Sequence, residues 1–489
     1  MKLEFHGHDE RYTVEQSLLN LFPGELPEYE PIAPGDGDWA VVSCRAEEEN
    51  RLLVTVDLSY HGEKTTAYHT ASLSGTDYDR EGQRRHTIGS CFFRAYQALT
   101  GNTPPWGMLT GVRPDKLITQ ALSQGKTPRE ARALLERDFL VTPRRAALAL
   151  ETGTAAYQAA QDLQPRDIAL YVGIPFCPTR CAYCSFVSQS VEKSFSLVDP
   201  YLDALTAEIR RAGEVVRRNN LRIRALYVGG GTPTTLSARQ LHRLFTELET
   251  AFPLGLGLEI TVEAGRPDTI TAEKLGVLRD AGTTRVSVNP QTMEPHVLEA
   301  IGRRHSPGDI ERAMELVSDA GFRQVNMDLI AGLPEDSPAG FRRTLDRCLA
   351  FHTSDITVHT LALKKGSRIL LDGLSIPGPE AVGDMLDYAE PTLRQAGYAP
   401  YYLYRQKYMS GSFENVGWTR PGGGSLYNIY IMSELCSILS LGAGGSTKMV
   451  DAPSRRIQRV FNHKYPTEYV SRPEKIEANL ASFDAFYNE

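Results

Sequence analysis

The sequence has no long apolar run. No stretch approaches the roughly 20 apolar residues that a membrane-spanning helix needs, and the N-terminal residues MKLEFHGHDERY contain no apolar signal-peptide core. We therefore expect a cytoplasmic protein with no membrane partner. Hydrophobic residues make up 41% and charged residues 23% of the chain, which is ordinary for a globular protein with a sizeable core.

A surplus of basic charge is also absent. The net charge is -7, whereas binding to nucleic-acid phosphates calls for a concentrated basic surface. The most basic stretch, residues 210–224, has the pattern of a helix followed by a linker, and its arginines are expected on a solvated helix face. We expect no nucleic-acid partner.

The chain has few cysteines, and their number is odd. Seven cysteines without an export signal argue against a disulfide framework. Four of them, Cys44, Cys91, Cys348 and Cys436, are scattered among apolar neighbours and are expected to be small buried hydrophobic residues. The other three are clustered.

A length of 489 residues predicts a large core domain with additions at one or both ends. Residues 1–165 read as an α+β module. Arg51–Tyr60 alternates like a half-buried strand with Trp39–Arg45 as its hairpin partner, and helical patterns follow over 84–100, 113–123 and 128–160. The module has no metal or nucleotide motif.

Residues 166–363 alternate short β-rich runs with helical patterns. The runs are 168–174, 225–228, 258–262, 285–288, 324–330 and 355–361. Six such repeats predict an α/β fold, an open partial (β/α)6 barrel of parallel strands with its site at their C-terminal ends. Residues 364–489 read as a smaller α+β extension packed on the barrel, with helices near 380–395, 427–437 and 474–487.

The clustered cysteines directly follow the first barrel strand. Cys177, Cys181 and Cys184 are spaced C-x3-C-x2-C, and such spacing arises by chance in only about one such chain in a thousand. A zinc site is the alternative, but zinc takes four ligands and no further His or Cys lies nearby in the sequence. Three thiolates suit a [4Fe-4S] cluster with one iron left open to another ligand.

Further polar groups follow the next strands. Gly230, Gly231 and Thr232 come after the second strand, where glycines let the backbone approach a ligand and the threonine adds a hydroxyl, as a zwitterionic aminocarboxylate requires. The absence of a following Lys-Ser/Thr pair makes a P-loop improbable.

Charged and amide side chains are expected at the later strand ends. Glu263 follows the third strand, Gln291 follows the fourth, and Asp328 lies within the fifth. Ribose hydroxyls are suitable partners for Asp328 and Gln291, and Arg303 could pair with a methionyl carboxylate. The alternative is that Asp328 belongs to a structural ion pair.

Together the cysteine triad, GGGTPT, Gln291, Arg303 and the run DLIAGLP from Asp328 resemble the oxygen-independent coproporphyrinogen III oxidase branch of the radical-SAM superfamily, over about Ile168 to Val450. The long N-terminal module, with LTGVRP at 109–114, resembles more narrowly the HemZ-type coproporphyrinogen dehydrogenases. The resemblance implies oxidative decarboxylation of two propionates of coproporphyrinogen III to vinyl groups in haem biosynthesis. It further implies a porphyrinogen substrate, a [4Fe-4S] cluster, S-adenosylmethionine (SAM), a donor such as flavodoxin or ferredoxin, and a monomer.

The same resemblance implies which residues surround the cofactors. Around the SAM bound to the cluster it places Tyr183, Gly231, Thr232, Gln291, Arg303, Asp328 and Ala362. Near a second SAM it places Tyr171, Gly230 and Glu263.

The chain departs from the family pattern at three places. Gly173 stands where the best-known members have His, and Phe186 where they have a further Cys, which affects substrate placement and proton delivery. Related haem chaperones carry His-Asn-x-x-Tyr-Trp in the C-terminal region, whereas this chain begins the segment with Tyr427. A haem chaperone is therefore the first alternative function. A radical-SAM enzyme acting on tRNA is a second, but no second cysteine set or basic RNA module is visible in the sequence.

The substrate's four carboxylates call for local cations in an acidic protein. The candidates are Lys364, Lys365, Arg368, Arg304 and Arg113. Exposed charges without such a role are the alternative.

Overall fold

The computed structural model describes residues 1–488 apart from 23, 48–49, 112, 185–188, 191–193, 256, 364–366, 407–409 and 452–455. The chain forms two compact units, Met1–Leu150 and Glu151–Glu489. The sequence patterns predict three domains, with boundaries after residues 165 and 363. None of the helices that the structure describes is long and apolar enough to cross a membrane.

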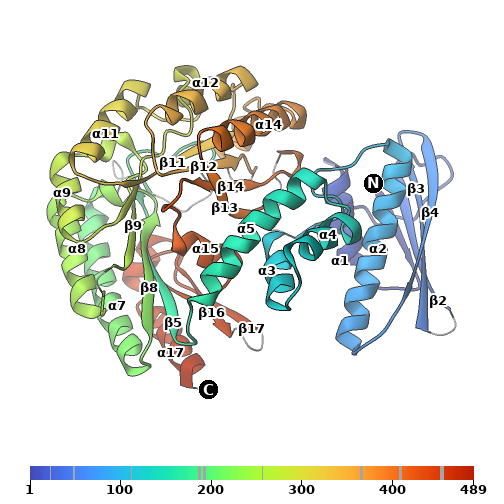
Figure 1. Ribbon diagram of the computed structural model, residues 1–489, viewed down its shortest axis with the longest axis horizontal. Helices are drawn as coiled ribbons and strands as arrows, with labels where there is room; N and C mark the ends of the chain where they lie inside the picture. Colours follow the sequence, from blue (N-terminus) through green and yellow to red (C-terminus); the bar gives the residue numbers. More distant parts are fainter. Residues whose placement is uncertain are drawn as a thin grey trace. The chain divides into compact units, whose positions relative to one another are not determined.

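The first unit is a four-stranded sheet with helices. Its strands are β1 (Lys2–His6), β2 (Trp39–Glu47), β3 (Arg51–Tyr60) and β4 (Glu63–Ser72). The expected hairpin is confirmed, because β2 and β3 pair antiparallel. Along β3, Val54, Val56 and Leu58 are buried on one face, and they form a core with Ile88 and Phe92 of α2 (Asp77–Thr100), which lies against that face in Figure 1.

The other helices of this unit are α1 (Arg11–Leu21), α3 (Asp115–Ser123) and α4 (Pro128–Asp138), and α5 (Pro143–Gln161) runs on into the second unit. The single helical pattern expected over 128–160 is thus two helices. Leu140 adopts a left-handed φ of 57° between them, and the next helix begins at Pro143. Proline favours the first helical turn, which explains why α5 begins there.

The second unit contains the predicted barrel strands in the predicted order. They are β5 (Asp167–Ile174), β8 (Arg222–Gly230), β9 (Glu259–Glu263), β10 (Arg285–Ser287), β11 (Gln324–Ala331) and β12 (Asp355–Thr360), each parallel to the next. The strands' apolar side chains are buried from both faces, as parallel sheets require. The α/β fold with a partial barrel is confirmed.

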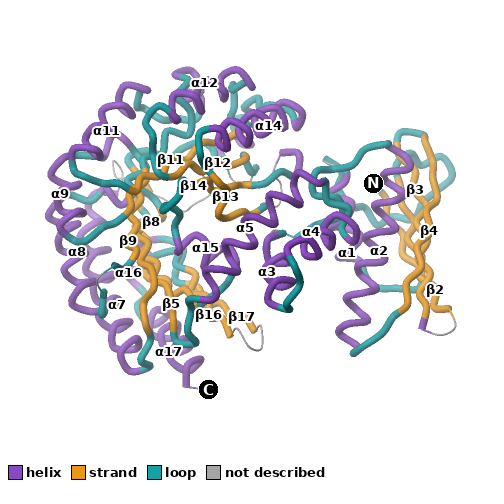
Figure 2. Tube along the Cα trace, viewed as in Figure 1, coloured by secondary structure: helices purple, strands orange, loops and turns teal. Residues whose placement is uncertain are grey.

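Helices cover the outer side of this sheet. They are α7 (Val198–Arg218), α8 (Ala238–Ala251), α9 (Ala272–Asp280), α11 (Pro307–Asp319), α12 (Pro338–Leu349) and α14 (Pro379–Gln395). Two short helices, α10 (Pro295–Ala300) and α13 (Arg368–Leu371), instead share an apolar cluster with Ala182 of the cysteine segment. Figure 2 shows the curved orange sheet with α7, α8, α9, α11 and α12 outside it. Serine caps such as Ser237 and Ser306 begin α8 and α11 and satisfy backbone donors there.

The C-terminal extension joins the sheet at both edges. β14 (Asn415–Thr419) pairs antiparallel with β12 and with β13 (Ala399–Tyr404), while β15 (Ser437–Leu441) pairs parallel with β5 and continues into β16 (Ser446–Asp451) and β17 (Arg456–Phe461). The result is one sheet of 11 described strands. The last helices are α16 (Pro466–Ser471) and α17 (Glu474–Asn488).

The remaining helix, α15 (Leu426–Ser433), lies on the inner side of the curved sheet (Figure 1). Glu259 of β9 anchors its N-terminus, because the carboxylate accepts hydrogen bonds from Ser425 Oγ and the Leu426 N–H at 2.8 and 2.7 Å. A carboxylate at a helix N-terminus is favoured by the helix dipole. The helix therefore fills the inside of the barrel at a fixed position.

Candidate active site

One cavity at the C-terminal ends of the barrel strands gathers most of the predicted site. Its lining includes Cys177, Cys181, Cys184, Tyr183, Gly230, Gly231, Thr232, Glu263, Gln291, Arg303, Asp328 and Ala362. These residues come from six strand ends and the loops after them, which meet at one end of a parallel sheet. Among the predicted SAM-contacting residues, Tyr171 is the one not in this lining.

The cysteine segment begins with Cys177 in the short strand β6 (Phe176–Cys177), which pairs with β7 (Gln189–Ser190). The segment is held by backbone hydrogen bonds, from the Ala182 N–H to the Ile301 carbonyl and from the Cys184 N–H to the Cys181 carbonyl, at 3.0 and 3.2 Å. All seven cysteines of the chain are free thiols.

Two donors point at the sulfur atoms. Thr232 Oγ1 lies 3.5 Å from Cys177 Sγ, and Arg266 Nη1 lies 3.8 Å from Cys181 Sγ. Burial alone would raise the pKa of Cys181, but the charges of Arg303 and Arg266 outweigh it and lower the pKa. An environment that favours a thiolate suits a metal ligand.

The glycine loop packs against the cysteine segment. The Gly231 N–H donates to the Ile174 carbonyl at 2.8 Å and the Thr232 N–H to the Phe176 carbonyl at 2.7 Å. A Cβ on Gly231 would lie 2.6 Å from the Phe176 carbonyl oxygen, and Gly230 has a left-handed φ of 108°. Gly231 therefore lets the loop lie close to the backbone of the cysteine segment, and Gly230 adopts a backbone conformation that favours glycine. Both glycines also line the cavity.

The two carboxylates of the cavity have opposite environments. Burial raises the pKa of Glu263 to about 7, although hydrogen bonds from Tyr227 and the Gly230 N–H act against the shift. Burial also acts to raise the pKa of Asp328, but hydrogen bonding with His359 and Asn326 lowers it overall. At neutral pH Asp328 is ionised, whereas Glu263 is divided between its two forms.

Asp328 contacts His359, as expected if Asp328 belonged to a structural ion pair. His359 Nε2 lies 3.7 Å from Asp328 Oδ1, and Asn326 Nδ2 donates to the same oxygen at 2.8 Å. Both Asp328 and His359 line the cavity, so the pair faces the site and is compatible with either role.

Gln291 is held in a backbone conformation that is rare outside glycine. Its φ is 67°, and its backbone bridges to β11 through the Asp328 carbonyl at 2.9 Å and the Ile330 N–H at 3.0 Å. Such conformations cost free energy and concentrate at functional sites. The bridge brings Gln291 beside the strand that carries Asp328.

Arg303 is buried and already engaged. Its guanidinium donates to the carbonyls of Asn289 and Gly265 and to the Tyr183 hydroxyl, the last at 3.0 Å. Arg266, which the sequence patterns did not single out, binds Asp268 as well as Cys181. The only sequence signal for Arg266 is its position just after the third strand.

Other lining residues were not predicted either. They are Gly265, Asn289, Ile330, His359, Thr360, Leu361, Tyr404, Gln406 and Asn415. His359 interrupts the apolar pattern of the sixth strand, and that interruption is a usable signal. Tyr404 and Asn415 carry no such signal, because nothing in the local sequence assigns β13 and β14 to the sheet.

Three tyrosines stack on one another, and one of them, Tyr227, donates a hydrogen bond to Glu263 of the cavity lining. The Tyr227 ring lies 4.5 Å from that of Tyr427 and 6.2 Å from that of Tyr171, measured between centroids. Tyr427, which begins the segment where related chaperones carry their haem-associated His, is only 4% exposed. The residue is part of the packed interior.

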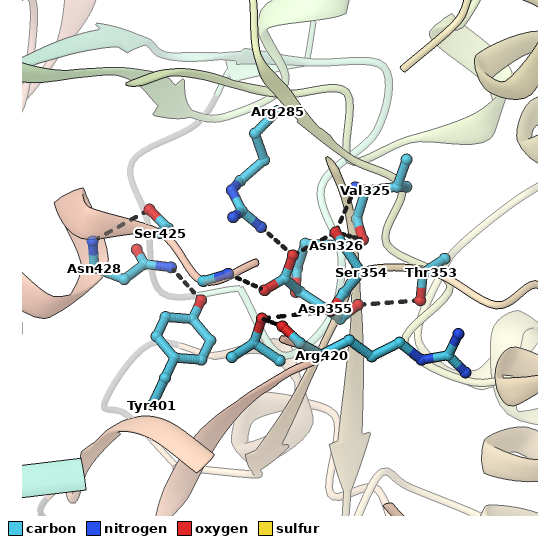
Figure 3. A network of polar contacts seen from close by, with 12 residues as sticks. Arg285, Val325, Asn326, Thr353, Ser354, Asp355, Tyr401, Arg420, Ser425 and Asn428 are labelled. Atoms are coloured by element: carbon cyan, nitrogen blue, oxygen red, sulfur yellow. Dashed lines mark hydrogen bonds and ion pairs between the residues drawn. The ribbon is translucent and has the colours of Figure 1, made fainter. Parts of the chain in front are cut away.

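A second polar network lies among residues at the start of the strands (Figure 3). Asp355 forms a buried ion pair with Arg285 and accepts a 2.9 Å hydrogen bond from the Gly424 N–H, in the loop ahead of α15. Tyr401 accepts a hydrogen bond from Asn428 of α15 at 3.3 Å. The network joins β10, β12 and β13 to the helix inside the barrel.

The comparisons with known proteins agree with this site. The Radical SAM superfamily matches residues 171–348, which contain the cysteine triad and most of the cavity lining. The "Oxygen-independent coproporphyrinogen-III oxidase-like protein HemZ" of Bacillus subtilis is 36% identical over 97% of this chain and 96% of its own. The chain belongs to the HemZ-like group of the radical SAM superfamily.

Two further relatives cover less of the chain. The heme chaperone HemW of Escherichia coli is 26% identical over 66% of this chain and 82% of its own. The structure of coproporphyrinogen III oxidase HemN from Escherichia coli matches with a TM-score of 0.52 at 24% identity, over 66% of this chain and 73% of that one. This likeness confirms the fold of the radical SAM core.

Membership of the radical SAM superfamily implies a [4Fe-4S] cluster and SAM, and the residues fit them. Three thiols line one cavity with two donors directed at their sulfurs. In the part of the chain that the structure describes, no group of three or more His, Cys, Asp or Glu side chains is placed to hold a metal ion. A cubane is compatible with this, because its irons occupy separate corners and its thiolates lie farther apart than the ligands of one ion.

The structure places two of the five expected substrate cations relative to the cavity. Arg368 is exposed and paired with Asp372 at 3.1 Å, and neither it nor Arg304 is in the cavity lining. Arg113 belongs to the first unit. Lys364, Lys365 and Phe186 lie outside the described residues.

Proposed function

We propose that this protein is an oxygen-independent coproporphyrinogen III dehydrogenase. It would remove two propionate carboxyl groups from coproporphyrinogen III and leave vinyl groups, giving protoporphyrinogen IX. The observation that supports this proposal most directly is that one cavity contains the three thiols together with Gln291, Arg303 and Asp328. Support also comes from the similarity to HemZ along nearly the whole chain.

The bound cluster and SAM would supply a 5′-deoxyadenosyl radical, which takes a hydrogen atom from the propionate β-carbon. Loss of CO2 and of one electron to an acceptor then leaves the vinyl group. The chain's own residues bind SAM and the substrate and hold them in position. Asp328, ionised at neutral pH, is suited to ribose hydroxyls, and Thr232 and the backbone of Gly231 are suited to the aminocarboxylate of SAM.

A second SAM site is part of the proposal. Gly230 and Glu263 adjoin each other through a 3.2 Å hydrogen bond, and a Cβ on Gly230 would lie 3.1 Å from the Tyr171 hydroxyl. The three residues that the family resemblance assigns to a second SAM are therefore neighbours. We also propose a monomer in the cytoplasm that receives electrons from flavodoxin or ferredoxin and binds neither nucleic acid nor membranes.

An anaerobic assay tests the function. The cluster-loaded protein with reductant, SAM and coproporphyrinogen III should release CO2 and form 5′-deoxyadenosine and protoporphyrinogen IX. A Cys181→Ala variant serves as the blank. The competing function is that of a haem chaperone, to which the HemW similarity points. Stoichiometric haem binding without any decarboxylated tetrapyrrole, in protein with an intact reduced cluster, would favour the chaperone and overturn the proposal.

A further inference from the structure

One part of the cavity wall is polar but has no role in the SAM site proposed above. It consists of His359 at the end of β12, Tyr404 at the end of β13, and Gln406 just after it. All three side chains are partly exposed, and all three line the same cavity as the cysteine triad.

The hydrogen bonds within this group are long. Tyr404 Oη lies 3.4 Å from His359 Nδ1 and 3.4 Å from Gln406 Nε2. Ordinary hydrogen bonds of these types are about 2.7–3.0 Å between heavy atoms, and those of ligand-free sites often tighten only when the ligand is bound. The imidazole Nδ1 and the tyrosine hydroxyl therefore retain capacity for a ligand.

His359 differs from the other basic side chains in the described lining. Arg266 and Arg303 are almost fully buried, and their guanidinium groups are engaged by Asp268, Cys181, Tyr183 and backbone carbonyls. The His359 side chain is 25% exposed, and its contact with Asp328 uses only Nε2. An imidazole ring that carries a hydrogen on both nitrogens can donate one hydrogen bond from each of them.

We propose that His359 and Tyr404 form the subsite for a substrate carboxylate. The imidazole ring lies between two carboxylates, with Nε2 toward Asp328 and Nδ1 toward the ligand, while the Tyr404 hydroxyl donates to the ligand's second oxygen. The identity of that ligand rests on the proposed function, in which it is a propionate of coproporphyrinogen III. Holding the carboxylate fixes the arm of the substrate in the cavity that contains the cysteine triad.

Binding of two porphyrins tests the subsite without relying on turnover. Coproporphyrin III, the stable oxidised form of the tetrapyrrole, carries four free propionates, and its tetramethyl ester carries none. Both are titrated into the cluster-loaded protein, and dissociation constants are obtained from the change in protein fluorescence. The variants are His359→Gln and Tyr404→Phe, and the matched control is His242→Gln, an exposed histidine on α8.

The wild type and the His242→Gln control should bind the free acid more tightly than the ester. His359→Gln should weaken acid binding about tenfold or more and leave the ester unchanged, because the ring N–H that donates to the carboxylate is lost. Tyr404→Phe should weaken acid binding severalfold by the same reasoning.

Two results would overturn the subsite. One is equal acid affinity in His359→Gln and wild type, and the other is an equal loss for acid and ester, which indicates a structural role. Turnover of coproporphyrinogen III by the wild type separates the two proposals. If turnover occurs and His359→Gln keeps its preference for the acid, only the subsite fails. If the wild type neither turns over the substrate nor binds coproporphyrin III, both fail.

Discussion

The Tyr227 hydroxyl donates a 2.6 Å hydrogen bond to Glu263 Oε1, which joins the second and third barrel strands at the cavity. The other carboxylate oxygen accepts from the Gly230 N–H at 3.2 Å. Burial, reinforced by the negative charge of Asp328, outweighs these bonds and raises the pKa of Glu263 from 4.5 to about 7. A carboxyl group that keeps its proton near neutral pH has a direct consequence for stability.

Between pH 4.5 and about 7, folded Glu263 holds its proton more tightly than the unfolded chain does. Its protonated form therefore stabilises the fold fully below pH 4.5, and this contribution disappears as pH rises through about 7. In a Glu263→Gln variant, the free energy of unfolding should fall less steeply over this range, by up to about 3 kcal/mol. Urea unfolding at several pH values measures it.

Glu299→Gln, an exposed site on α10, is the control and should follow the wild type. An unchanged slope in Glu263→Gln would show that Glu263 is already ionised at neutral pH in the folded protein.

Each cysteine of the triad should be needed for the cluster. Replacing Cys177, Cys181 or Cys184 with Ala should remove most of the roughly four irons per chain and abolish SAM cleavage, because two thiolates retain a cubane poorly. Iron analysis and 5′-deoxyadenosine formation measure the two effects. Cys348→Ala, in the buried face of α12, should keep both. Full iron content in the triad variants would refute the cluster assignment.

Asp328→Asn should raise the KM for SAM about tenfold while the iron content stays unchanged, because one charge-assisted hydrogen bond to the ligand is lost. The exposed Asp319→Asn on α11 provides the comparison. If Asp328→Asn binds SAM normally but unfolds at lower denaturant concentration, the pair with His359 is structural instead.

Gly231→Ala should disturb the cysteine segment. Its new Cβ would lie 2.6 Å from the Phe176 carbonyl oxygen, so β6 must shift and bound iron should decrease. Gly276→Ala makes the same chemical change in α9, where nothing lies within 4 Å, and should stabilise the helix by about 0.5–1 kcal/mol. Equal iron content in both variants would show that the loop tolerates a side chain.

The barrel and most of the site follow from local sequence patterns. Each parallel strand is a short apolar run whose polar neighbours must meet at one end, which is why the sequence alone suffices to place Glu263, Gln291 and Asp328 together. Arg303 does not follow a strand directly. The family pattern assigns it to the SAM site, and its side chain lines the same cavity.

The edges of the sheet could not be predicted in this way. Pairing of β15 with β5 joins segments that are far apart in the chain, and no local pattern encodes such a partner. Tyr404 and Asn415 reach the cavity only because β13 and β14 extend the sheet beyond β12. The C-terminal tyrosines have the pattern of a surface-packed module, whereas Tyr427 is stacked inside the barrel.

The buried ion pair of Arg285 and Asp355 should be the most sensitive polar contact outside the cavity (Figure 3). Their side chains are 2% and 0% exposed, so removing one partner leaves an unpaired buried charge. Asp355→Leu should lower the free energy of unfolding by about 3–5 kcal/mol and should release the loop ahead of α15, which Asp355 holds through the Gly424 N–H. Denaturant unfolding measures the loss.

The exposed pair of Arg368 and Asp372 is the control, and Asp372→Leu should cost no more than about 1 kcal/mol. Adding Arg285→Met to Asp355→Leu should recover much of the loss, because two apolar side chains no longer need compensation. A double variant as unstable as Asp355→Leu alone would instead assign the loss to the Gly424 contact.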